Sequence, residues 1–133
     1  MGHQAKALVQ RYFDALARDD LGDLPALLAD EYIEHGPARG RGPGAVQEAA
    51  RQLRAAFPDL QRTLLHVVAE DELVAVHVRV TGTHRGQLGA LPATGRAVDF
   101  TALQLFRAED GRLAEHWELF DDTTLQRQLA GEG

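Results

Sequence analysis

Cysteine is absent from the 133 residues of the chain. Its absence excludes a disulfide scaffold, a thiolate zinc site and a cysteine nucleophile. Long apolar runs are also missing: no segment approaches the roughly 20 apolar residues of a membrane-spanning helix, and the N-terminus has no apolar signal-peptide core. We therefore expect no membrane partner, and we expect the protein to work in the cytoplasm.

Basic residues are outnumbered, with 14 Lys and Arg against 20 Asp and Glu, which gives a formal net charge of −6. Binding to nucleic acid requires a basic stripe or patch on the protein surface. The charge balance therefore predicts that nucleic acid is not a partner.

The overall composition is that of an ordinary globular protein, with 44% apolar and 26% charged residues. These values exclude a disordered chain, a coiled coil and a collagen-like repeat. The length fits a single domain spanning residues 1–133, because domains cluster near roughly 100–150 residues.

Helical patterns occupy the first half of the chain. Over residues 4–18, apolar side chains recur at spacings of one, three and four, as on one face of an amphipathic helix. Pro25 falls in the first turn of a second, short helix. Residues 32–43 are rich in glycine and proline and are expected to form a loop. A third helix is predicted from about Gly44 until Pro58 stops it.

Strand patterns fill the second half, and a last short helix is expected over about 123–130. The predicted strands cover residues 60–70, 73–83, 97–107 and 112–121. Helices followed by a run of antiparallel strands indicate an α+β fold. We expect a cone-shaped α+β barrel, in which the N-terminal helices pack on a strongly curved antiparallel sheet and enclose a cavity for a small molecule.

Several sequence motifs occur in a characteristic order. They read YIEHGP at 32–37, FPD at 57–59, GTHRG at 82–86, LGALPATGR at 88–96, FRAEDGRLAEHWELFD at 106–121 and LQRQLAG at 125–131. This order resembles the SnoaL-like polyketide cyclase (ester cyclase-like) family of the nuclear transport factor 2-like superfamily, over nearly the whole chain. The resemblance implies ring closure by intramolecular aldol condensation without a metal or organic cofactor. It also implies that Asp121 acts as the catalytic acid/base and that His35 matches the family histidine.

Strand alternation puts Asp121 on the same face as Leu119, Trp117 and Leu113. If this face lines the pocket, burial raises the pKa of Asp121, which can then remove a proton from a carbon beside a carbonyl. The alternative is that Asp121 caps the final helix, a role that we expect Asp122 to take.

Other residues are expected to bind the substrate. Trp117, Leu119 and Phe13 would provide apolar contacts, and His84 belongs to the GTHRG motif beside the predicted cavity mouth. Gln104 would bind a substrate oxygen if its face is the concave one, a choice the sequence leaves open.

His116 and Glu118 alternate with Asp121 along the same predicted strand, so we expect them on the outer face or at a dimer interface. No HxH or HExxH spacing occurs, and we expect no metal site.

The predicted function is that of a cofactor-independent cyclase, or a related isomerase or lyase, acting on a hydrophobic polyketide-like carbonyl compound. One alternative is a small-molecule binding protein without turnover. Another is a water-adding enzyme of the epoxide hydrolase or dehydratase type. We also expect a homodimer, because the sheet has two apolar faces and helices cover one of them.

Overall fold

The computed structural model describes residues 2–36 and 39–132. In chain order the elements are α1 (Gly2–Ala17), the 3-10 turn η1 (Leu21–Asp23), α2 (Leu24–Leu27), β1 (Leu28–Glu34), β2 (Gly40–Arg41), α3 (Gly42–Ala56), β3 (Gln61–Glu70), β4 (Leu73–Thr83), β5 (Ala97–Glu109), β6 (Arg112–Phe120) and α4 (Asp122–Leu129). The predicted helices and the four long strands are confirmed to within a few residues. No helix in these two ranges is long and apolar enough to cross a membrane.

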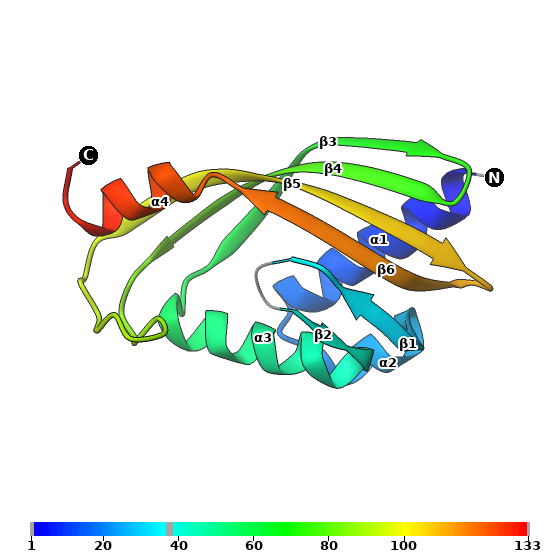
Figure 1. The fold of residues 1–133 in the computed structure, drawn as a ribbon, viewed down its shortest axis with the longest axis horizontal. Helices are drawn as coiled ribbons and strands as arrows, with labels where there is room; N and C mark the ends of the chain where they lie inside the picture. Colours follow the sequence, from blue (N-terminus) through cyan, green and yellow to red (C-terminus); the bar gives the residue numbers. More distant parts are fainter. Residues whose placement is uncertain (1, 37–38, 133) are drawn as a thin grey trace.

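The strands form one curved sheet in the order β2-β1-β6-β5-β4-β3. The sheet is mixed rather than purely antiparallel, because β1 runs parallel to β6. The helix α1 contacts β3 and β4, and α3 contacts β1, so both helices cover the same face of the sheet (Figure 1). The α+β class is confirmed, with a sheet that curves without closing on itself.

The strand β1 corrects the expectation of a loop over residues 32–43. Tyr32 lies on β1 and is fully buried, and Glu34 is paired in register with His116 of β6. The pairing partner is more than 80 residues away in the sequence, so local glycine and proline content did not indicate the strand. As a consequence, β1 brings a carboxylate next to the middle of β6.

The inner face of the sheet carries the core. As the alternation predicts, Val74, Val76, Val78 and Val80 of β4 are all buried. Phe106 of β5 is completely buried, and the rings of Tyr12 and Phe13 from α1 meet it edge-on, at centroid distances of 5.2 and 5.9 Å. These contacts fix α1 across the sheet.

Two β-bulges change which side chains face inward. In β6, Glu115 pairs with Arg107 while Leu113 pairs with Ala108, so Ala114 is an extra residue. Leu113 and Ala114 are both buried, and the alternation is reversed beyond them. A second irregularity makes Leu65 the extra residue of β3. A bulge moves every later side chain of its strand to the opposite face.

The connection between β4 and β5 docks on the end of α3. The backbone N–H groups of Arg85 and Gly86 both donate to the carbonyl of Ala56, at 3.0 and 3.1 Å. A Cβ atom on Gly86 would lie 2.1 Å from the carbonyl oxygen of Ala55, so only glycine allows this approach. The connection therefore closes one end of the space between the sheet and α3.

Candidate active site

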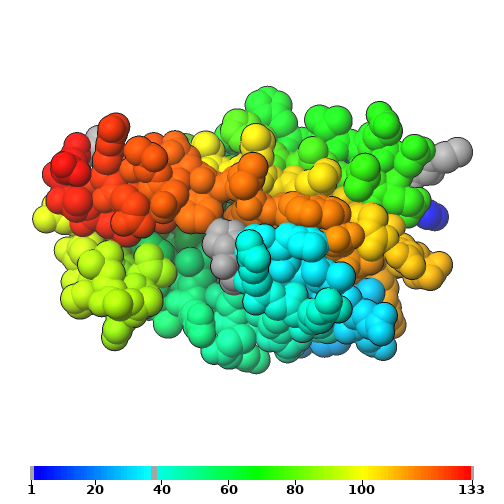
Figure 2. Space-filling view, in the orientation of Figure 1, coloured from blue at the N-terminus to red at the C-terminus, as the bar shows by residue number. Residues whose placement is uncertain are grey.

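A cavity of about 860 Å³ lies between the inner face of the sheet and the helices. In Figure 2 a recess separates β6 and α4 from α3. The wall is mainly apolar, with rings from α1 and β5 and aliphatic side chains from α3 and β4. Its polar members are Tyr12, Glu34, Gln52, Arg62, Gln87, Gln104, His116, Glu118, Asp122 and Gln126. The size and character of this space suit a hydrophobic small molecule with a few polar groups.

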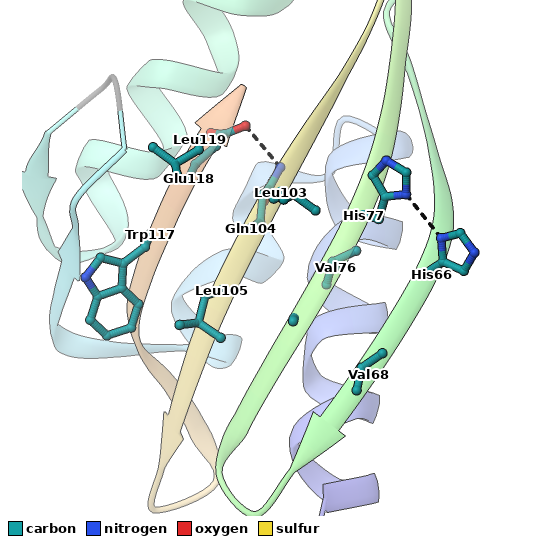
Figure 3. Close-up of a pocket in the computed structure, with 11 residues that line it drawn as sticks. His66, Val68, Val76, His77, Leu103, Gln104, Leu105, Trp117, Glu118 and Leu119 are labelled. Atoms are coloured by element: carbon teal, nitrogen blue, oxygen red, sulfur yellow. Dashed lines mark hydrogen bonds between the residues drawn. The ribbon is translucent and has the colours of Figure 1, made fainter. Parts of the chain in front are cut away.

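A chain of polar contacts crosses the cavity wall from β1 to β6 and β5. The Tyr32 hydroxyl donates to Glu34 Oε1 at 2.8 Å, and Glu34 Oε2 lies 2.5 Å from His116 Nδ1. The other ring nitrogen of His116, Nε2, donates to Gln104 Oε1 at 2.8 Å. The Gln104 amide in turn donates to Glu118 Oε2 at 3.1 Å, the bond drawn dashed in Figure 3. Two carboxyl groups are thus linked through one imidazole and one amide.

The His116 ring contacts a different side chain through each nitrogen. Because Gln104 gives its amide N–H to Glu118, its carbonyl oxygen must accept from the Nε2–H of His116. On the other side of the ring, Nδ1 and the Glu34 carboxylate stand at ion-pair distance without hydrogen-bond alignment. His116 therefore joins β1 to β5 across the cavity wall.

Glu118 is a carboxyl group of the cavity wall whose pKa is changed by its surroundings. Burial raises the pKa of Glu118, and the nearby carboxylate of Glu34 raises it further. His116, Arg62 and the hydrogen bond from Gln104 act in the opposite direction without cancelling the effect of burial. A carboxylate held above its ordinary pKa is a stronger base, suited to removing a proton from carbon.

The structure places Asp121 outside this cavity, contrary to the sequence expectation. Its carboxylate caps α4: Oδ1 accepts from the Thr124 backbone N–H at 3.1 Å and Oδ2 from the Thr124 hydroxyl at 2.6 Å. These hydrogen bonds hold the pKa of the exposed Asp121 carboxyl below its usual range. The capping alternative therefore applies to Asp121 itself, whereas Asp122 begins the helix and borders the cavity.

Three further predicted site residues lie on the outer face, the sheet surface turned away from α1 and α3. Trp117 and Leu119 project there, and Leu119 is 79% exposed (Figure 3). The His35 ring stacks on Trp117 at a centroid distance of 5.0 Å, and its Nε2 lies 2.6 Å from Glu115. The bulge at Ala114 is the reason: it turns Trp117, Leu119 and Asp121 away from the face that Leu113 occupies.

Gln104 and Phe13 do line the cavity. Of the two faces that the sequence left open for Gln104, the structure therefore shows the concave one. His84 is fully buried in the connection after β4, where its Nδ1 lies 3.0 Å from the Thr94 hydroxyl. It is not among the residues of the cavity wall.

Sequence reasoning missed four residues of the site. His116 and Glu118 had been expected on the outer face, and Glu34 and Arg62 had not been singled out. One signal was present for the first two: Leu113 and Ala114 are successive apolar residues, and they break the alternation where the bulge lies. In residues 2–36 and 39–132, no three His, Asp or Glu side chains are grouped so that they could hold a metal ion.

Comparison with known proteins agrees with this fold. The family described as SnoaL-like polyketide cyclase matches residues 6–129. The chain therefore belongs to the SnoaL-like polyketide cyclase family. It is 30% identical over 129 residues to the aklanonic acid methyl ester cyclases DauD of Streptomyces sp. (strain C5) and DnrD of Streptomyces peucetius, covering 92% of this chain and 79% and 88% of those proteins.

Solved structures show the same architecture. Wild-type IdmH from Streptomyces antibioticus superposes with a TM-score of 0.83 at 29% sequence identity, over 96% of this chain and 99% of that one. TsrD from Streptomyces laurentii gives a TM-score of 0.87, also at 29% identity, over 96% and 95% of the two chains.

Proposed function

We propose that the protein is a cofactor-independent cyclase that closes a ring by an intramolecular aldol-type reaction on a hydrophobic polyketide-like carbonyl compound. The observation that carries the proposal is Glu118, a carboxyl group of raised pKa in a mainly apolar cavity. Membership of a family whose relatives include aklanonic acid methyl ester cyclases supports the reaction class. Glu118 takes the acid/base role that the resemblance gave to Asp121.

The reaction requires one proton to leave carbon and one to reach oxygen. The ionised Glu118 removes a proton from the carbon beside a substrate carbonyl and becomes neutral. The resulting enolate carbon attacks a second carbonyl of the same molecule, a carbon–carbon bond forms, and the alkoxide oxygen takes up a proton from Glu118. Product and substrate are isomers, so the step needs no other reactant. The Gln104 amide orients Glu118 for both transfers.

Turnover of aklanonic acid methyl ester, a substrate of the relatives, tests this assignment. We expect Glu118→Gln to lower kcat by about 10²- to 10⁴-fold, since this is the usual contribution of a general acid/base. The glutamine keeps an oxygen that can accept from Gln104, so the wall stays intact.

The matched control is Asp121→Asn, a carboxyl-to-amide change three residues away at the exposed cap of α4. It should leave kcat within about twofold. Full activity of Glu118→Gln, or loss of activity in Asp121→Asn alone, would contradict the proposal. Binding of the ester by the wild-type protein without turnover would identify a binding protein instead.

We also propose that the protein forms a homodimer through the outer face. Large apolar side chains are exposed there, including Val68 at 65%, Leu103 at 62% and Leu119 at 79%. They surround an open depression of about 660 Å³ whose other members include His66, His77, Leu105 and Trp117 (Figure 3). A contiguous apolar surface of this kind is suited to a second copy of the same surface.

A further inference from the structure

Arg62 is a cation in the wall of the cavity. It lies on β3 opposite Val80 of β4, a buried inward-facing residue, and so points to the inner face. Without a bulge, Arg62 and His66 would point to the same face of the sheet, because they are four residues apart on one strand. The extra residue Leu65 lets Arg62 point inward while His66 points to the outer face. The guanidinium stands near Glu118 and the Tyr12 hydroxyl without reaching ion-pair distance to the carboxylate.

Arg62 has no acceptor of its own within the described ranges 2–36 and 39–132, where no hydrogen bond or ion pair to its side chain is found. Arg54 of α3 and Arg79 of β4, by contrast, hold acceptors. Arg54 donates to the carbonyls of Leu16 and Leu60, and Arg79 holds Asp99 through two hydrogen bonds of 2.9 and 2.6 Å. Because Arg62 lines the cavity, its five N–H donors are available to a molecule bound there.

The Arg62 side chain is half-buried in the mainly apolar wall. Burial lowers the pKa of Arg62, and the field of the Glu118 carboxylate opposes this effect without cancelling it. A cation that loses part of its hydration without gaining a partner is less stable than a paired one. The counter-charge missing from the protein is best supplied by whatever occupies the cavity.

We propose that the guanidinium of Arg62 binds a planar, two-oxygen anion of the ligand, either a carboxylate or the delocalised enolate of a 1,3-dicarbonyl group. The rigid fork of a guanidinium matches two coplanar oxygens, which a lysine ammonium would not. The enolate form rests on the proposed function: as Glu118 becomes neutral, the negative charge that it loses appears on oxygens held by Arg62. The local charge is then unchanged during proton transfer.

Binding of flat probes of similar size tests the assignment by isothermal titration calorimetry. The probes are 2-naphthoate, its neutral methyl ester, and benzoylacetone titrated above and below the pH at which it forms its enolate. In the wild-type protein we expect at least one anion to bind about ten- to hundredfold more tightly than its neutral form. A preference for 2-naphthoate identifies a carboxylate site, and a preference confined to ionised benzoylacetone identifies an enolate site.

The variant Arg62→Met should abolish that preference while leaving the affinity for the methyl ester within about twofold. Arg62→Lys should retain only part of it, because the charge remains and the fork is lost. Arg11→Met makes the same charge change on the exposed side of α1 and should behave as wild type. Glu118→Gln should tighten anion binding, because it removes the neighbouring negative charge.

Folding is checked by the thermal midpoint, which should stay close to that of wild type in Arg62→Met because no hydrogen bond or ion pair of the Arg62 side chain is found in the described ranges. Equal affinity of the wild type for the anions and their neutral forms, or an anion preference that survives in folded Arg62→Met, would overturn the proposal. These measurements need no turnover. A failed cyclase assay with intact anion binding would thus refute the reaction and not the Arg62 site.

Discussion

Two acidic residues three positions apart, Glu118 and Asp121, meet opposite environments. Glu118 faces the cavity, where burial raises its pKa, and Asp121 lies in solvent, where its bonds to Thr124 lower its pKa. The difference follows from what surrounds each carboxylate, since an apolar wall disfavours the charge and two donors favour it. The raised pKa makes the Glu118 carboxylate a stronger base, whereas the lowered pKa of Asp121 results from its hydrogen bonds as a helix cap.

The raised pKa of Glu118 predicts how stability depends on pH. The unfolded chain releases this proton near pH 4.5, before the folded protein does, so the folded state holds more protons in between. The free energy of unfolding therefore falls as pH rises through this window and levels off above the folded pKa. Glu118→Gln removes this loss. Its stability relative to wild type should rise from pH 4 toward neutrality, by about 1.4 kcal/mol per pKa unit.

Urea denaturation of both proteins between pH 4 and pH 8 measures this difference. Glu48→Gln, on the exposed side of α3, provides the same change of charge outside the cavity. If the free energies of unfolding of Glu118→Gln and wild type differed by the same amount at every pH, the pKa of Glu118 would not be raised in the folded protein.

At the level of elements, the sequence predicted those parts of the fold whose signals are local. The alternating valines of β4 and the Asp110-Gly111 turn before β6 correspond to observed structure, with Asp110 and Gly111 both at positive φ. The prediction of which β6 side chains face the cavity was wrong. One extra residue, Ala114, reverses the inward and outward alternation of all later side chains of the strand. Gln104 lies on a strand without such a break before it, and its inward direction follows from Phe106.

The rest of the site depends on contacts between distant segments. Glu34 reaches His116 because β1 adds to the sheet beside β6, and no local pattern indicated that pairing. Arg62 faces the cavity only because the bulge at Leu65 follows it in β3. A residue-by-residue reading cannot determine such placements, since they result from the register of strands that pair across the chain.

The docking of the β4–β5 connection on α3 predicts that Gly86→Ala is destabilising. The new methyl group would meet the Ala55 carbonyl at 2.1 Å, so the connection must shift away from α3. We expect a loss of about 1–3 kcal/mol in the free energy of unfolding, measured by urea denaturation. Gly44→Ala, where no atom lies within 4 Å in α3, should instead be neutral or stabilising. Equal effects of the two variants would contradict the close approach.

Over the whole molecule, the sheet separates two surfaces of different chemistry. Its inner face, with the helices, surrounds a cavity with Glu118 and Arg62 in its wall. Its outer face exposes apolar side chains with histidines among them, including the His66–His77 pair, whose Nδ1 atoms are 3.1 Å apart. Substitution of an outward-pointing side chain such as Leu119 therefore leaves the wall of the cavity unchanged.

This separation allows a direct test of the dimer. Leu119→Glu introduces a charge on the outer face, and we expect it to convert a wild-type dimer into a monomer in light scattering after size-exclusion chromatography. Leu91→Glu makes the same change in the β4–β5 connection, where the leucine is 38% exposed, and should remain dimeric. A monomeric wild type at tens of micromolar would refute the interface.

The chain contains a single tryptophan, Trp117, and the bulge at Ala114 puts it outside the cavity, stacked on His35. Its intrinsic fluorescence is therefore a natural reporter of what happens on the outer face. Emission should change when two copies associate and stay constant when a colourless ligand enters the cavity. One optical signal can thus follow assembly independently of substrate binding, in the unlabelled protein.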